Sequence, residues 1–174
     1  LMGHEKFFIQ MILGTVLGIW IYNIFGGVIW LPIIGSINIS ILIIPFAIFT
    51  LLSMTNAVNF SDGMDGLSAG MLISSYFGFL VIAIFENNIE IAVLISTVIG
   101  SLLTYLYFNI PPARVQMGDV GSFSLGALLA VVAFALDRVF LLPIIGFPFV
   151  VEVASSVLQS LARRIFGKRI LRMA

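Results

Sequence analysis

Apolar residues fill six long stretches of the chain, and short segments rich in polar residues, glycine or proline separate them. The stretches approach the roughly 20 residues needed to cross the hydrocarbon core of a bilayer. The fifth is short, which favours a tilted or broken span and makes the fifth and sixth a candidate for one broken unit. We therefore predict an all-α fold, a polytopic transmembrane helix bundle of about six segments at residues 7–25, 39–55, 67–85, 89–108, 122–136 and 140–161.

The composition agrees with this prediction. Hydrophobic residues make up 61% of the 174 positions and charged residues only 9%, whereas soluble domains contain about 25% charged residues. No soluble domain fits between the stretches, so we expect residues 1–174 to form a single transmembrane domain. A net charge of zero argues against nucleic-acid binding. The absence of cysteine excludes disulfides and thiolate chemistry, and a single histidine excludes a histidine cluster.

Lysine and arginine residues gather on one side of the predicted topology. If Lys6 faces the cytoplasm and six spans follow, seven of the eight basic residues face inward and only Arg138 faces outward. This distribution satisfies the positive-inside rule. It also places Asp62, Asp65 and Asp119 together on the cytoplasmic face, so the candidate site is predicted to be cytoplasmic.

Polar residues recur at every third position across the end of the second stretch, at Asn56, Asn59, Asp62 and Asp65. Groups three residues apart lie near one another on a helix, so these amides and carboxylates are expected to line one wall. The glycines at 63 and 66 allow the helix to end in a turn and a ligand to approach the backbone closely. A simpler interpretation is a polar helix end followed by a glycine turn, with no ligand.

A second polar segment runs from Asn109 to Ser122. Its two adjacent prolines end the preceding span, and Ser122 is a candidate cap for the next helix. Asp119 then lies at a helix N-terminus, where free N–H groups favour phosphate and a carboxylate can bind Mg²⁺ together with substrate phosphates. The simpler interpretation is an aspartate stabilised by the helix dipole alone.

A carboxylate in or near a bilayer has an energetic cost that a partner or ligand must offset. An aspartate at the membrane centre costs about 2.5 to 3.5 kcal/mol on the insertion scale, and less near the interface. Three aspartates on one side are easiest to explain if they share a metal or another ligand. Glu152, inside the last stretch, is a further candidate for function, although a serine one turn away could satisfy it equally well.

The motifs resemble those of the polyprenyl-phosphate N-acetylhexosamine-1-phosphate transferase superfamily, and within it the phospho-N-acetylmuramoyl-pentapeptide transferase branch. The similar segments are NAVNFSDGMDGLSAG at 56–70, FNIPPARVQMGDVGSFSLGA at 108–127, and VEVASSVLQ at 151–159 followed by GKRILRMA at 167–174. The first two are specific to the superfamily and the third favours the branch. The resemblance covers essentially the whole chain.

The resemblance implies an enzyme of the bacterial inner membrane with a cytoplasmic active site. It would transfer phospho-N-acetylmuramoyl-pentapeptide from its UDP carrier to undecaprenyl phosphate in a reaction that depends on Mg²⁺. The products would be UMP and the first lipid-linked peptidoglycan precursor. The implied partners are these two substrates and the lipid bilayer, without nucleic acid, and a homodimer is a further hypothesis. Both a direct displacement and a covalent aspartyl route are open at this point.

The resemblance also implies roles for individual residues. Asp119 matches the aspartate that binds Mg²⁺, and Asp62 and Asp65 match the other catalytic loop aspartates. The residues implied in substrate binding are Asn56, Asn59, Gly63, Asn109, Gln116 and Gln159.

Two departures from the family pattern matter. Gln116 occupies the position where the family usually has a phenylalanine that can stack on uracil. The family's upstream aspartate pair and its histidine-rich loop are not in this sequence, and the first residue is leucine. We therefore expect a fragment, the central to C-terminal part of a longer enzyme, that is inactive alone.

Three alternatives stay open. A related transferase that uses UDP-N-acetylglucosamine or another UDP-sugar would share the aspartate motifs. A cation-coupled transporter would place carboxylates along its path, but here the acids cluster at one face. A non-catalytic membrane scaffold would make the spacing of the asparagines and aspartates a coincidence.

Overall fold

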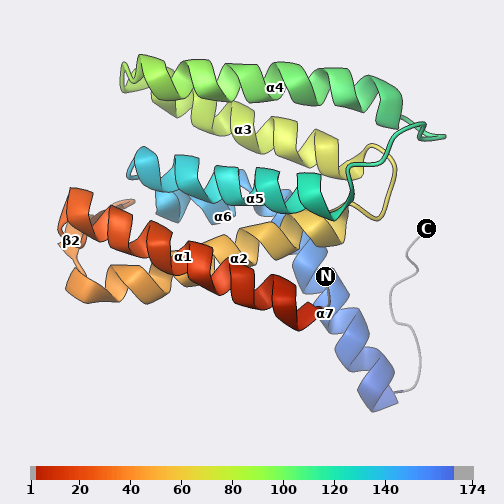
Figure 1. Cartoon of the computed structure of the whole chain (residues 1–174), viewed down its shortest axis with the longest axis horizontal. Coiled ribbons are helices and arrows are strands. Elements are labelled where there is room, and N and C mark those ends of the chain that lie inside the picture. The colour runs from red at the N-terminus through yellow and green to blue at the C-terminus, as the bar shows by residue number, and fades with distance from the viewer. Residues whose placement is uncertain (1–2, 167–174) are drawn as a thin grey trace.

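The structure of the protein is a computed structural model, and it describes residues 3–166. Within this part of the chain, five helices are long and apolar enough to cross a membrane. They run antiparallel to their neighbours in sequence, as expected for spans joined by short connections (Figure 1). Their bounds are α1 Gly3–Phe25, α2 Ile43–Ser61, α3 Leu67–Phe85, α4 Ile89–Asn109 and α5 Gly118–Ala135. The predicted polytopic helix bundle is thus confirmed.

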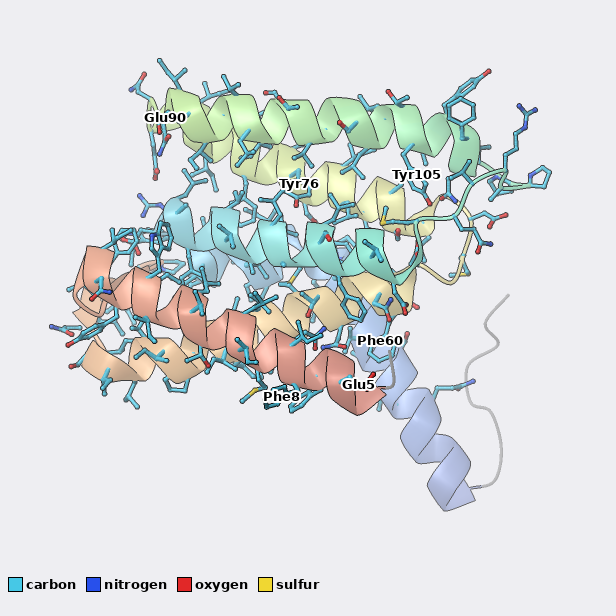
Figure 2. The ribbon with its side chains drawn as sticks, viewed as in Figure 1. Glu5, Phe8, Phe60, Tyr76, Glu90 and Tyr105 are labelled. Carbon is cyan, nitrogen blue, oxygen red and sulfur yellow. The ribbon has the colours of Figure 1, made fainter. Side chains whose placement is uncertain are left out.

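The helices form two groups that meet at α5. Helix α2 packs between α1 and α5, whereas α3 and α4 form a pair on the other side of α5 (Figure 1). Tyr76 of α3 lies fully buried in the larger core, together with Phe79 and Leu129. The Tyr76 hydroxyl donates a 2.8 Å hydrogen bond to the Leu125 carbonyl oxygen and so joins α3 to α5 (Figure 2).

Helix α5 approaches the backbone of α2 closely because Gly126 has no side chain. A Cβ at this position would lie 2.7 Å from the Met54 carbonyl oxygen and 2.8 Å from the Cα of Thr55. Small residues at such crossings let membrane helices come into contact along their backbones. This contact sets the separation of the two helices whose ends carry Asp62 and Asp119.

A short β-hairpin, not predicted from the sequence, connects α1 to α2. Strands β1 Val28–Leu31 and β2 Gly35–Asn38 pair antiparallel, and the 3₁₀-helix η1 Ser40–Leu42 leads into α2. The segment is nearly apolar throughout, so the alternation that normally reveals a strand is weak.

The predicted bounds of the sixth span are wrong, because residues 140–161 do not form one helix. The chain forms η2 Val139–Leu141, a four-residue helix α6 Leu142–Ile145 and then α7 Phe147–Phe166. The Gly146 N–H bonds back to the Leu142 carbonyl oxygen and closes α6. Helix α7 then contacts α2 and projects away from the bundle at its far end (Figure 1). The basic segment 167–174 lies outside the described residues.

Polar contacts join the loops at the hairpin end of the bundle. Arg138 forms a 2.6 Å ion pair with Glu86 and lies 4.4 Å from the centroid of the Trp30 ring. The Trp30 backbone N–H donates a 3.1 Å hydrogen bond to an Asp137 carboxylate oxygen. These contacts hold the hairpin and the α3–α4 and α5–η2 turns together, at the end opposite to Asp62.

Candidate functional site

The loops that follow α2 and precede α5 lie at the same end of the bundle. Helix α2 ends at Ser61, so Asp62 takes the C-cap position, and its N–H bonds to the Val58 and Asn59 carbonyl oxygens. Gly66 adopts a φ of +76° immediately before α3, a conformation that favours glycine. Helix α5 begins at Gly118, which places Asp119 in its first turn.

Asn59 connects these two helix ends. Its Nδ2 group donates a 3.0 Å hydrogen bond to the Oδ1 atom of Asp119 and another of 3.0 Å to the Ser122 Oγ atom. Ser122 is buried and donates to the Gly118 carbonyl oxygen within α5. The interpretation of Ser122 as a helix cap is therefore wrong, because the helix starts four residues earlier. Ser122 instead helps to hold the Asn59 amide in place beside Asp119.

Asp62 lies close enough to Asp119 for their charges to interact. Partial burial raises the pKa of the Asp62 carboxyl, and the negative charge of Asp119 raises it further. A 3.2 Å hydrogen bond from the Ser68 hydroxyl and a contact with the Gly118 N–H act in the opposite direction. The net effect favours the protonated carboxyl relative to an exposed aspartate.

Asp65 does not continue the helical row that the spacing predicted. Because α2 ends at Ser61, Asp65 lies in the following loop and is exposed. Its Oδ2 atom accepts a 3.0 Å hydrogen bond from the Ala113 backbone N–H. The predicted helical face of four polar residues is therefore wrong in this part, although Asp65 still lies at the same end of the bundle.

Asn109 ties together the two loops that carry the aspartates. Its Oδ1 atom accepts a 2.8 Å hydrogen bond from the Gly66 N–H, and its Nδ2 group donates one of 2.8 Å to the Val115 carbonyl oxygen. Asn109 is only 4% exposed. Both ends of its amide are thus engaged within the protein, which makes it a positioning residue for both loops in this structure.

The other predicted substrate-binding residues occupy different positions around these loops. Gly63 is exposed in the loop after α2. Gln116 is exposed and borders a cavity of about 490 Å³ that Tyr105 of α4 also lines (Figure 2). Gln159 is buried on α7. Glu152 is half-buried on the same helix, and the Ser155 hydroxyl bonds to its backbone carbonyl oxygen rather than to its carboxylate.

An apolar groove of about 830 Å³ runs along α2 towards Asp62. It lies between α2, the η2–α6 segment and α7, and its walls extend from Phe46 to Phe60 along α2. Phe60 lies near the C-terminal end of α2, where α7 crosses α2 (Figure 2). Asn56 is the polar wall residue nearest to Asp62 in the chain. The lining of the groove along α2 therefore ends at Phe60, two positions before Asp62 in the chain.

The oxygen donors at the site suit a hard cation held partly by substrate. No cluster of three or more histidine, cysteine or acidic side chains that could hold a metal occurs among residues 3–166 as described. Asp62 and Asp119 nevertheless interact electrostatically. Mg²⁺ is commonly bound through one or two carboxylates with substrate phosphates completing its shell, so the residues present fit such an ion.

Two contributors were missed by the sequence reasoning. Ser68 bonds to Asp62 from the first turn of α3, and Gln10 of α1 contacts Thr55 and Asn56. A lone amide inside an apolar span was the available signal for Gln10, because a buried polar group in a membrane needs a partner. Ser68 had no signal beyond its nearness to Asp62 in sequence.

Comparison with known proteins gives one family. Residues 1–137 match the model of glycosyl transferase family 4. The chain is 39% identical over its whole length to the phospho-N-acetylmuramoyl-pentapeptide-transferase of Latilactobacillus sakei, covering 55% of that protein. It is 38% identical to the protein of the same name from Lacticaseibacillus paracasei, over 95% of this chain and 53% of the relative. The chain thus spans about half the length of these curated relatives.

Proposed function

The chain belongs to glycosyl transferase family 4, and we propose that it serves the transfer of phospho-N-acetylmuramoyl-pentapeptide from its UDP carrier to undecaprenyl phosphate. The names of its relatives support this choice of substrate. The observation that carries the proposal is the electrostatic interaction of Asp62 with Asp119 at the end of α2, the helix that also forms one wall of the apolar groove. A lipid-linked acceptor and a charged nucleotide donor would meet at such a place.

The groove suits the acceptor. Its walls are almost entirely apolar, and they follow α2 for residues 46–60, or about 20 Å at the rise of an α-helix. A polyprenyl chain in the groove would place its phosphate near Asn56 and the end of α2. The phosphate would then face the α5 N-terminus, where N–H groups favour an anion.

Mg²⁺ is the proposed cofactor. Asp119 would hold it, with phosphate oxygens of the donor completing its shell. The bound ion would neutralise negative charge on the diphosphate of the donor. Asn59 would fix the Asp119 carboxylate, because it donates to Oδ1 from the neighbouring helix.

Asp62 is the proposed general base. An oxygen of the lipid phosphate would attack the sugar-linked phosphorus, and the bond from that phosphorus to the UMP oxygen would break. Burial raises the pKa of Asp62, which brings it closer to the pKa of about 6 of a phosphate monoester. A base whose pKa approaches that of its partner accepts the proton more readily.

The site is proposed to face the cytoplasm. The loops with Asp62 and Asp119 lie at one end of the bundle, and the Arg138–Glu86 pair lies at the other. The inward assignment uses the positive-inside rule and depends mainly on Lys6 and on basic residues from Arg163 onward, whose side chains lie outside the described residues.

Release of UMP tests the proposal directly. The complete protein in membranes, supplied with Mg²⁺, undecaprenyl phosphate and UDP-N-acetylmuramoyl-pentapeptide, should release UMP, and Asp119→Asn should abolish the release. Full activity in that variant would overturn the metal assignment. Turnover only with UDP-N-acetylglucosamine would identify the related transferase instead. Cation flux without UMP release would identify a transporter.

A further inference from the structure

Gln10 is a buried polar residue in the membrane-spanning part of α1. Its side chain is 7% exposed, and the apolar window of α1 extends from Phe7 to Phe25. An amide without hydrogen bonds is costly in such surroundings. Its partners therefore indicate what the residue does.

Both partners of Gln10 lie on α2. The Nε2 group of Gln10 donates a 3.2 Å hydrogen bond to the Thr55 hydroxyl. The Oε1 atom of Gln10 accepts a longer one of 3.4 Å from the Nδ2 group of Asn56. Nδ2 of Asn56 also donates a 2.7 Å hydrogen bond to the Leu52 carbonyl oxygen. The Asn56 amide is thus held on its nitrogen side by two acceptors.

Asn56 lies in the part of the groove wall that is nearer to the C-terminal end of α2. It is half-buried and lines the groove together with Ala57 and Phe60. It lies six positions before Asp62, which corresponds to about 9 Å along a helix. The orientation of the Asn56 amide therefore sets the shape of the groove near the point where an acceptor phosphate would emerge.

We propose that Gln10 is a positioning residue for the lipid acceptor, because it fixes the orientation of the Asn56 amide in the wall of the groove. The inference rests on the proposed function. Without Gln10, the Asn56 amide keeps its hydrogen bond to the Leu52 carbonyl oxygen but loses its second acceptor, so its orientation in the groove wall is no longer fixed from α1. Recognition of the nucleotide donor, which would occur at the loops beyond Asp62, does not depend on this contact.

A purely structural role for Gln10 predicts a different kinetic result. Polar contacts between membrane helices contribute to packing, and the hydrogen bond to Thr55 serves that purpose alone. Loss of packing would lower the amount of folded, active protein and therefore the apparent kcat. It would leave both KM values unchanged, because the remaining active molecules would be normal.

The two roles are separated by steady-state kinetics on the complete protein in membranes. Gln10→Met removes both contacts at similar volume. Gln10→Glu keeps an oxygen that accepts from Asn56. Thr55→Val removes the bond from Gln10 to Thr55, together with the bonds of the Thr55 hydroxyl within α2, but keeps the contact between Gln10 and Asn56. We expect Gln10→Met to raise KM for undecaprenyl phosphate about three- to tenfold, the effect of losing one buried hydrogen bond. KM for the UDP-linked donor should stay within about twofold.

The matched variants decide the outcome. Gln10→Glu should restore much of the acceptor KM, and Thr55→Val should leave it unchanged. An unchanged acceptor KM in Gln10→Met, or an equal rise in both KM values, would overturn the positioning role. If Gln10→Met fails to fold, a normal acceptor KM in Thr55→Val with a raised one in Asn56→Ala supports the role, and equal changes in both refute it. Absence of UMP release in the unmodified protein would instead refute the proposed function itself.

Discussion

Asn59 on α2 donates a 3.0 Å hydrogen bond to Asp119 at the start of α5, across a separation of 60 residues in sequence. The contact joins the two motifs that the sequence analysis treated as separate. It also fixes one oxygen of the carboxylate proposed to hold Mg²⁺. The amide can do this because Ser122 accepts its second 3.0 Å bond.

Asn59→Ala should lower the rate of UMP release about 10- to 100-fold, the usual cost of losing a residue that orients a metal ligand. The loss should be smaller at high Mg²⁺ concentration, because weaker metal binding can be overcome by mass action. The rate of UMP release, measured over a range of Mg²⁺ concentrations for both proteins, tests this expectation. A full loss that no Mg²⁺ concentration relieves would argue against an orienting role.

Ser68→Ala should move the acidic limb of the pH–rate profile to higher pH. The Ser68 hydroxyl lowers the pKa of Asp62, so its removal raises that pKa further. A general base must be deprotonated to act, and activity is then lost at a higher pH as the pH falls. Profiles of kcat/KM for both proteins provide the measurement. If the acidic limb lies at the same pH in both proteins, Asp62 is not the general base.

Gly126→Ala should destabilise the protein by about 1 to 3 kcal/mol, because the added Cβ would overlap the backbone of α2. It should also reduce activity by separating Asn59 from Asp119. Gly100→Ala is the matched control on α4, since a Cβ there meets nothing within 4 Å. Thermal unfolding in detergent and UMP release would be compared for both variants. Similar stability in the two would contradict the close helix contact.

Arg138→Ala should cost about 1 to 2 kcal/mol of stability, because it removes an ion pair and a cation–π contact. Glu86→Gln should cost less than about 1 kcal/mol, since the pair is partly exposed. Both changes lie at the end opposite to Asp62, so the Mg²⁺ dependence and both KM values should be unchanged. A change in those constants would show that the two ends of the bundle are coupled.

The membrane spans were predictable because long apolar stretches leave little choice of structure. The ends of α2 and α5 were not, because they depend on local backbone conformation. Gly118 adopts a φ of +65° and starts α5 four residues before Ser122. The prediction of the final span was wrong for a related reason, since α6 ends at Ile145, Gly146 is its C-cap, and α7 begins at Phe147.

The site was predictable as a set of residue types but not as a set of contacts. Spacing along α2 correctly grouped Asn59 with Asp62 at one end of the bundle. It could not reveal that Asp65 turns to the Ala113 N–H, or that Asn109 is engaged at both ends of its amide. Those contacts arise when distant loops meet, and no local pattern encodes them.

The groove beside α2 has an exposed apolar rim at Phe49, Phe60 and Leu158, and in a bilayer that rim would face lipid. An acceptor would then arrive sideways from within the membrane by two-dimensional diffusion. Its effective concentration would be its mole fraction among the lipids rather than its amount per volume. Diluting the vesicles with inert phospholipid would slow the reaction even at a constant total quantity of acceptor, and the cell could regulate the rate through lipid composition alone.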